Sequence, residues 1–242
     1  MTPQANGHGA SSELSEWRDH TRVFLQPIAA PSILGLFGFA AATFMVAAHL
    51  AGWYGSSESP TFLFPFAATF GGLAQFAAGM WAYRARDGLA TAMHGMWGAF
   101  WIAFGILFLL VATGDITIPT GKFVELGFWF LTLAAITAAG AVASIAENLG
   151  LTAVLTTLAV GAALLAVGYL TGIEGWLRSG GWVLIASAIF AWYVASALML
   201  KSTFGRVVLP LGEPRKAANV PGNQVTRAIE YEFGEPGVKQ GQ

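Results

Sequence analysis

Polar side chains inside long apolar stretches are the first candidates for chemistry, because each must find a partner or contact water. Gln75 follows Gly71 and Gly72, where backbones can approach closely. Its amide could bond a neighbouring helix or line a solute path, and the two roles are compatible. His94 could sense pH or be a satisfied structural group. We expect threonines to bond mainly to their own helix, but take Thr157, with Gln75 and His94, as candidate polar lining of a path.

Sites for metals, cofactors and catalysis are not indicated. The chain has no Cys, and neither His49 nor His94 has a second His or a carboxylate at ligand spacing, so we predict no metal site. No Ser lies in a Gly-x-Ser-x-Gly turn. Gly121-Lys122 resembles the end of a phosphate-binding loop, but Ile116 stands where the first Gly should be. We therefore predict that the chain is not an enzyme and needs no cofactor.

The apolar stretches are long enough to cross a membrane. Of the 242 residues, 55% are hydrophobic and 10% charged, and the net charge of −1 argues against nucleic-acid binding. A bilayer core about 30 Å thick needs about 20 apolar residues in a helix. Six runs meet this length: Ser32–Trp53, Thr61–Tyr83, Leu89–Thr113, Phe123–Ala146, Leu149–Thr171 and Gly181–Leu200. They do not alternate as barrel strands do, so we predict an all-α integral membrane protein, a six-transmembrane-helix bundle.

The bundle divides the chain into a cytoplasmic N-terminal segment (1–30), a membrane domain (31–204) and a cytoplasmic C-terminal tail (205–242). Apolar residues at helical spacing within 12–25 suit a helix at the membrane surface, or else a tail that orders only near Arg22. Ten Lys and Arg residues fall on the side of the termini, and only Lys122 and Arg178 on the other. The positive-inside rule predicts a multi-pass protein of the cytoplasmic (inner) membrane with both termini in the cytoplasm.

The centres of the six apolar runs contain no charged residue. The fourth run carries one acid, Glu125, at its start. A carboxylate proton relay inside the membrane is therefore not predicted, and the absence of a phosphate-binding loop argues against a primary pump. We expect transport that is passive or coupled only through the proton of the substrate.

Three blocks of sequence resemble the acetate uptake transporter family. The first, similar to N-P-A-P-L-G-L and then G-F, is Ala30-Pro31-Ser32-Ile33-Leu34-Gly35-Leu36 with Gly38-Phe39. The second, similar to Y-G-G-x-A-Q, A-G and Y-G-S/A-F-W, is Phe70-Gly71-Gly72-Leu73-Ala74-Gln75, Ala78-Gly79 and Trp97-Gly98-Ala99-Phe100-Trp101. The third, similar to F-G-R-x-V-L-P-x-G-E, is Phe204-Gly205-Arg206-Val207-Val208-Leu209-Pro210-Leu211-Gly212-Glu213.

The resemblance implies a homo-hexamer in which each protomer has its own pore. It also implies an apolar constriction built by the first, third and fifth helices. Its positions are Phe39 and Trp97, matched by motif, and Leu158, placed by counting back from 166–168. On sequence alone, these three residues would be ordinary packing. Where the family has Asn, Pro, Glu and Tyr, this chain has Ala30, Ile33, Ala82 and Trp97.

The substrate that the resemblance implies is acetate or a similar short monocarboxylate. A carboxylic acid with the pKa of a Glu side chain is roughly one part in 500 neutral at pH 7. The anion is costly to move through an apolar neck, so either the neck wets transiently or the neutral acid crosses, and both remain open. The alternatives are a six-helix channel for another small solute, such as urea or short amides, and a membrane sensor that signals through its tail.

Overall fold

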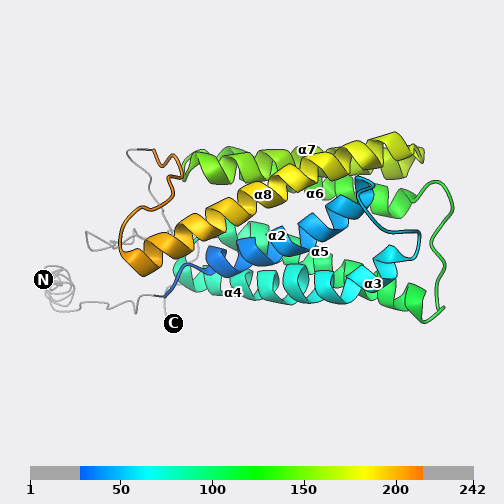
Figure 1. Ribbon diagram of the computed structural model, residues 1–242, viewed down its shortest axis with the longest axis horizontal. Helices are drawn as coiled ribbons and strands as arrows, with labels where there is room; N and C mark the ends of the chain where they lie inside the picture. The colour runs from blue at the N-terminus through cyan, green and yellow to red at the C-terminus, as the bar shows by residue number, and fades with distance from the viewer. Residues whose placement is uncertain (1–27, 215–242) are drawn as a thin grey trace, which may run out of the picture.

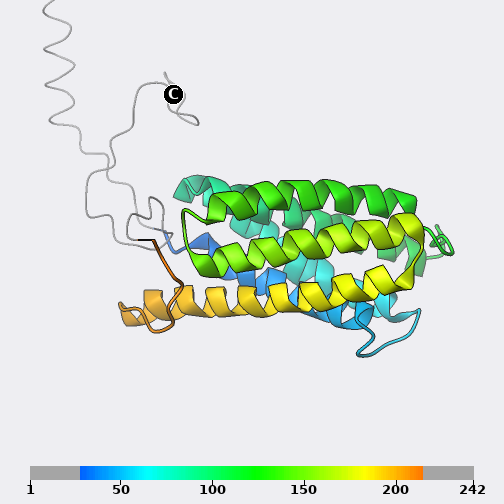
Figure 2. The same cartoon turned by 90° about the horizontal axis from the view of Figure 1, so that it is seen from above.

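The computed structural model describes residues 28–214, which form a bundle of long helices (Figures 1 and 2). Within this range, six helical segments are long and apolar enough to cross a membrane. They are α2 (Pro31–Leu50), the joined α3 (Ser59–Phe66), η1 (Ala67–Ala74) and α4 (Gln75–Ala85), then α5 (Gly88–Ala112), α6 (Val124–Ser144), α7 (Leu149–Thr171) and α8 (Glu174–Phe204). The all-α class with six membrane helices is confirmed. The surface helix expected within 12–25 lies outside the described residues, as does the tail beyond 214.

The predicted boundaries agree closely with the structure except in α8. That helix was expected to begin at Gly181, but its first turns include Glu174 and Arg178, charged residues that an argument from hydropathy excludes. Arg178 can be accommodated because its Nε donates a 3.1 Å hydrogen bond to the carbonyl of Ala51, next to the end of α2. The polar start of α8 is thus anchored to the neighbouring helix.

The second membrane segment is not a regular α-helix. Pro65 lies inside α3, and the chain then passes through the π-helical η1 before regular helix resumes at Gln75. Small residues let this segment press closely on its neighbours: a Cβ added to Gly71 would lie 2.6 Å from the ring of Trp101. π-helical turns often occur at functional sites, and this one ends directly before Gln75, a candidate lining residue.

The helices close into a ring around a shared interior. α6 packs on α7, α7 on α8, α8 on α2, and α2 on η1 and α4, which pack on α5; a smaller contact joins α5 to α6. Both ends of the described chain lie at one end of the bundle (Figures 1 and 2). We call this end, where α2 begins and α8 ends, the terminal end, and the other the opposite end. The helices α2, α5 and α7 all run from the terminal end to the opposite end.

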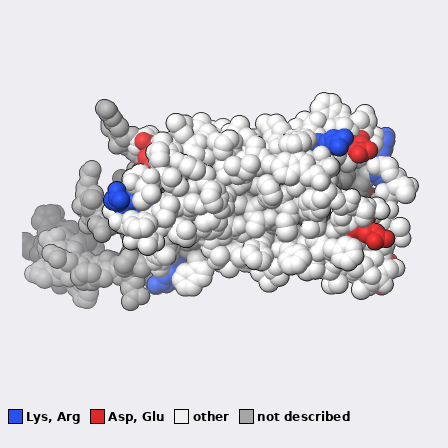
Figure 3. Space-filling view, in the orientation of Figure 1, with Lys and Arg blue, Asp and Glu red and all other residues white. Residues whose placement is uncertain are grey.

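Charged side chains are confined to the two ends of the face shown in Figure 3, with an uncharged band between them. Large apolar side chains such as Phe62, Leu73 and Trp192 are exposed around the bundle. Because a bilayer core cannot hydrate charges and favours apolar surface, this distribution is that of a multi-pass membrane protein.

The segment after α8 turns back onto the bundle. Gly205 ends α8 with φ of 65°, a left-handed conformation that glycine adopts readily. The carbonyls of Gly212 and Leu211 then accept the N–H groups of Leu149 and Gly150, the first residues of α7, at 3.3 and 3.0 Å. Leu211 is 7% exposed. Residues 205–214, which the sequence assigned to the C-terminal tail, thus dock on the terminal end and cap α7.

Candidate functional site

Three large apolar side chains from different helices meet in the interior of the bundle. Phe39 of α2, Trp97 of α5 and Leu158 of α7 are 2%, 3% and 2% exposed. The rings of Phe39 and Trp97 meet edge to face, with centroids 6.4 Å apart and planes at 70°. All three line one small cavity. We call these three residues the neck; they are the residues that the resemblance placed in a constriction, and the structure brings them together.

Two small cavities lie along the interior, one on each side of the neck. Residues that precede the neck in α2, α5 and α7 line the terminal cavity, and residues that follow it line the opposite cavity. Trp97 and Leu158 line both. Each cavity has a volume of about 30 Å³, enough for about one or two water molecules. The interior therefore holds two small cavities separated by packed apolar side chains.

The neck ring of Trp97 is held from outside the path. Its indole Nε1 donates a 3.0 Å hydrogen bond to Oγ1 of Thr137 on α6. The Thr137 hydroxyl in turn donates to the carbonyl of Leu133 at 2.6 Å. Because the Trp97 N–H is already bonded, the neck offers no free donor from this ring to a carboxylate.

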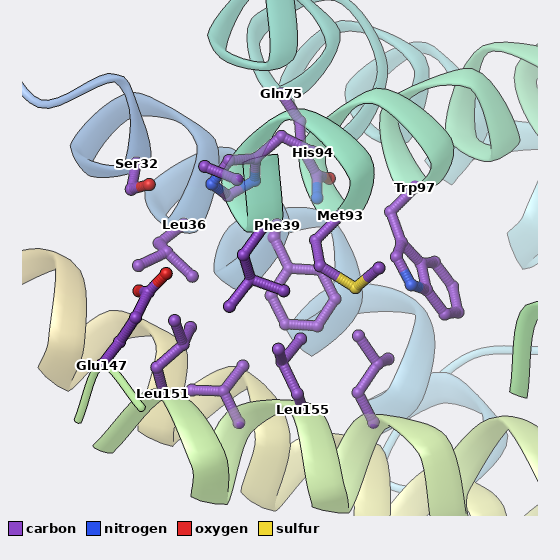
Figure 4. A pocket seen from close by; sticks show the side chains of 14 residues that line it. Ser32, Leu36, Phe39, Gln75, Met93, His94, Trp97, Glu147, Leu151 and Leu155 are labelled. Carbon is purple, nitrogen blue, oxygen red and sulfur yellow. The ribbon is translucent and has the colours of Figure 1, made fainter. Parts of the chain in front are cut away.

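The terminal cavity has polar atoms that lack partners. Gln75, at the start of α4, and His94 of α5 line it and are 3% and 5% exposed (Figure 4). Gln75 Oε1 and His94 Nδ1 have no hydrogen-bond partner in the described part of the chain. Buried polar atoms are almost always bonded, to protein or to water. These two predicted lining residues are thus placed where a water or a small solute can bond them.

The opposite cavity also has two buried polar atoms without a hydrogen-bond partner in the described residues. Thr43 Oγ1 and Trp101 Nε1 line this cavity, are buried, and have no hydrogen-bond partner within residues 28–214. The remaining wall is largely aromatic and includes Phe100, Phe104, Phe130 and Tyr169. A solute on this side of the neck would therefore meet ring faces and two hydrogen-bonding groups.

Two other polar residues do not line these two cavities. Thr157 lines neither cavity, and its hydroxyl donates to the carbonyl of Ala153, one turn back in α7, at 2.7 Å. The structure therefore does not place Thr157, a predicted lining residue, on either cavity, and its hydroxyl bonds its own helix as expected for threonines. His49 lies near the end of α2, where its Nδ1 is 3.2 Å from the carbonyl oxygen of Tyr54.

Two carboxylates stand at the terminal end. Asp87 caps α5: its Oδ1 accepts the N–H of Ala90 at 2.8 Å, while Oδ2 has no partner in the described residues. Glu147, in the turn between α6 and α7, lines the terminal cavity (Figure 4). Burial and then the charge of Asp87 raise the pKa of Glu147 to about 7. Burial also raises the pKa of Asp87, opposed by hydrogen bonds from the Ala90 and Leu89 amides.

The roles of Thr137, Asp87 and Glu147 were not predicted from the sequence. A Thr in an apolar helix gives no local sign that a Trp 40 positions away will bond to it. The sequence does contain one indication for the two acids. Asp87 directly precedes a membrane helix and Glu147 lies two residues before one, and acids at such positions can cap the helix or face a solute path.

Comparisons with known proteins agree with this architecture. The sequence profile of the GPR1/FUN34/yaaH family matches residues 18–212. The chain is 28% identical over 193 residues to the succinate-acetate/proton symporter SatP of Escherichia coli, covering 77% of this chain and 96% of that one. It is 32% identical over 172 residues to ammonia transport outward protein 2 of Saccharomyces cerevisiae, covering 69% of this chain and 60% of that one.

A solved structure is also similar. The structure of the bacterial acetate channel SatP matches with a TM-score of 0.70 and 26% sequence identity, over 76% of this chain and 99% of that one. These matches confirm the resemblance carried by the three sequence blocks. Since the profile match extends over the whole membrane bundle, the chain belongs to the GPR1/FUN34/yaaH family.

Proposed function

We propose that this chain passes acetate and related short monocarboxylates across the membrane, and that it is not an enzyme. The observation that carries the proposal is the neck, which lies between two interior cavities of about 30 Å³ each. Relatives named as a succinate-acetate/proton symporter and an acetate channel support the substrate. The path is lined by a single chain, which supports one pore in each protomer.

The chemistry of the neck favours the neutral acid over the anion. Phe39 and Leu158 have no polar side-chain atoms, and the N–H of Trp97 is bonded to Thr137. A carboxylate in the neck would lose its water without gaining a donor from these side chains, which is costly. A narrow apolar constriction can also exclude ions by staying dry. The acid therefore crosses the neck uncharged and carries its own proton.

The distribution of Lys and Arg supports one orientation of the bundle in the membrane. Ten of these residues lie in the terminal-end connections and terminal segments of the chain, and two, Lys122 and Arg178, at the opposite end. This asymmetry supports a cytoplasmic terminal end in a bacterial-type inner membrane. The terminal cavity then opens toward the cytoplasm and the opposite cavity toward the outside.

The outer surface supports assembly with further copies. A groove of about 820 Å³ runs between α2, the α3–η1 segment and α8, and is lined almost entirely by apolar side chains such as Phe44, Phe70 and Trp192. Large exposed apolar grooves in membrane bundles accept either lipid chains or a neighbouring protein. With the resemblance, this supports a homo-hexamer. Native mass spectrometry of the detergent-extracted protein should give six chains, and a monomer mass would contradict it.

A second candidate substrate is ammonia. One relative is named for ammonia transport. Neutral ammonia could cross the apolar neck as a neutral acid does, and aromatic faces such as those around the opposite cavity attract ammonium.

A flux assay decides between these substrates. Purified protein in liposomes is given labelled acetate, succinate, urea or methylammonium, with empty liposomes as the control. Acetate should enter fastest, because the neck limits size and charge. Methylammonium or urea flux without acetate flux would replace the proposed substrate. A folded protein that passes none of the four would contradict a transport function and favour the sensor.

A further inference from the structure

The terminal cavity combines a carboxylate with two unpartnered polar atoms. Glu147 lies on one side of it, and Gln75 and His94 on the other (Figure 4). Gln75 Oε1 and His94 Nδ1 are buried and have no partner in the described ranges. Because such atoms need a bond from water or a solute, this cavity is suited to receive a small polar molecule beside a carboxylate.

Asp87 adds a second negative charge near Glu147 without lining the cavity. Its Oδ1 is held at the N-terminus of α5 by the Ala90 amide at 2.8 Å, where the helix dipole favours the charged carboxylate. Two neighbouring carboxylates do not both ionise easily, and the less stabilised one keeps the proton. The pKa of Glu147 at about 7 reflects burial and this charge, so its protonated and ionised forms are both populated near neutral pH.

Other ionisable groups lie on the elements at this end of the bundle. They include His94 in the cavity wall, Arg84 in the last turn of α4, Arg86 next to Asp87, and Lys201, Arg206 and Glu213 on α8 and the segment after it. Lys201 and Glu213 form an ion pair of 2.8 Å and so largely satisfy each other. Glu147 is the carboxylate that lines the cavity itself.

We propose that Glu147 is the proton-exchange site of this path, an inference that rests on the proposed function. A neutral acid that has crossed the neck, RCOOH, transfers its proton to the Glu147 carboxylate, directly or through a water. The products are the substrate anion RCOO⁻ and protonated Glu147, and outward passage reverses the step. One of the two carboxyl groups is neutral at each stage, so they do not repel. Gln75 Oε1 can accept the acid's O–H before the transfer.

This role fixes how exchange depends on pH. If every passage includes proton transfer with Glu147, equilibrium exchange follows the anion concentration multiplied by the protonated fraction of Glu147. Exchange is then nearly flat between the pKa of the substrate acid and the pKa of Glu147, and falls about tenfold per pH unit above the latter. Without such a group, exchange follows the neutral acid in water and falls about tenfold per unit from about pH 5.5 upward.

The test is exchange of labelled acetate by proteoliposomes with equal pH on both sides. Between about pH 5.5 and 6.5, the wild type should change less than about twofold, and Glu147→Gln should lose about tenfold. Asp87→Asn keeps a capping side chain on α5 but removes the charge, so the flat region should end at lower pH. Glu125→Gln removes an exposed acid at the opposite end and should retain the wild-type profile.

The outcomes separate the site from the function. Equal pH profiles for the wild type and a folded Glu147→Gln protein would overturn the proton-exchange site while leaving acetate transport intact. Wild-type exchange no faster than in empty liposomes would overturn the proposed function, and the site with it. If Glu147→Gln does not fold, Asp87→Asn decides the question: an unmoved end of the flat region overturns the proposal.

Discussion

Trp97 and Thr137 join the neck to a helix that contributes no residue to it. The indole Nε1 lies 3.0 Å from the Thr137 hydroxyl oxygen on α6, and Thr137 is fully buried. This bond fixes the orientation of the largest ring in the neck. It also removes the one N–H that could otherwise bond a carboxylate there.

Replacing Thr137 with Val should destabilise the protein and relax the selectivity of the neck. Val has nearly the shape of Thr but cannot accept the Trp97 hydrogen bond, and a buried unpaired N–H costs about 1–3 kcal/mol. The freed N–H can bond an anion, so acetate flux at about pH 8, relative to about pH 6, should rise. Melting temperature and flux are measured together. Thr157→Val, which removes a bond within α7 only, should leave the flux unchanged; an equal effect in both variants would contradict the argument.

Opening the neck should raise acetate flux. Phe39→Ala and Leu158→Ala widen it, and Trp97→Tyr removes ring area and adds a hydroxyl that helps the neck hold water. If these residues only pack the bundle, the truncations should cost about 2–5 kcal/mol on a soluble-protein scale with no gain in flux.

The matched control for the neck variants is Leu133→Ala. Leu133 is 1% exposed on α6 and lines neither cavity. Its truncation should lower the melting temperature without raising flux per folded protein. Flux that is unchanged in all three neck variants, with lowered melting temperatures, would leave only the packing role.

The membrane helices could be predicted because their main determinant is local. A run of about 20 residues without charge is sufficient to identify each one, and Gly205 marks the end of α8 by the same kind of local chemistry. The start of α8 could not be predicted in this way. Arg178 belongs to the helix because the carbonyl of Ala51, 127 residues earlier, accepts its hydrogen bond.

The site was predictable only in part, for a related reason. In a membrane bundle, a helix is apolar on every face, so periodicity does not separate path-lining residues from packing residues. Phe39 and Trp97 could be assigned to the constriction because each lies in a motif that resembles one of the family. The sequence alone could not separate Thr157 from a lining residue, because a hydroxyl that bonds its own helix looks the same in sequence as one that faces a path. The relation between Glu147 and Asp87 exists only after folding.

The orientation can be tested with single cysteines, because the chain has none of its own. Ser57→Cys and Thr117→Cys, both exposed at the opposite end, should react with a membrane-impermeant maleimide added outside intact cells. Ala146→Cys in the α6–α7 turn, which is also exposed, and Ala218→Cys should react only after the cells are opened. Reaction of the second pair in intact cells would reverse the orientation.

The raised pKa of Glu147 also predicts how stability depends on pH, independently of transport. The folded protein binds this proton more tightly than the unfolded chain, because the pKa rises from 4.5 to about 7 on folding. The stabilisation is therefore fully present below pH 4.5 and is lost as the pH rises through about 7. Gln at position 147 is neutral at every pH, so the melting temperature of the wild type should fall relative to Glu147→Gln across this window. Below pH 4.5, the melting temperatures of the wild type and Glu147→Gln should differ by a constant amount. Asp87→Asn should shrink the fall, because the charge of Asp87 is the second cause of the shift. Parallel melting curves for wild type and Glu147→Gln from pH 4.5 to above 7 would show that folding does not perturb this carboxyl.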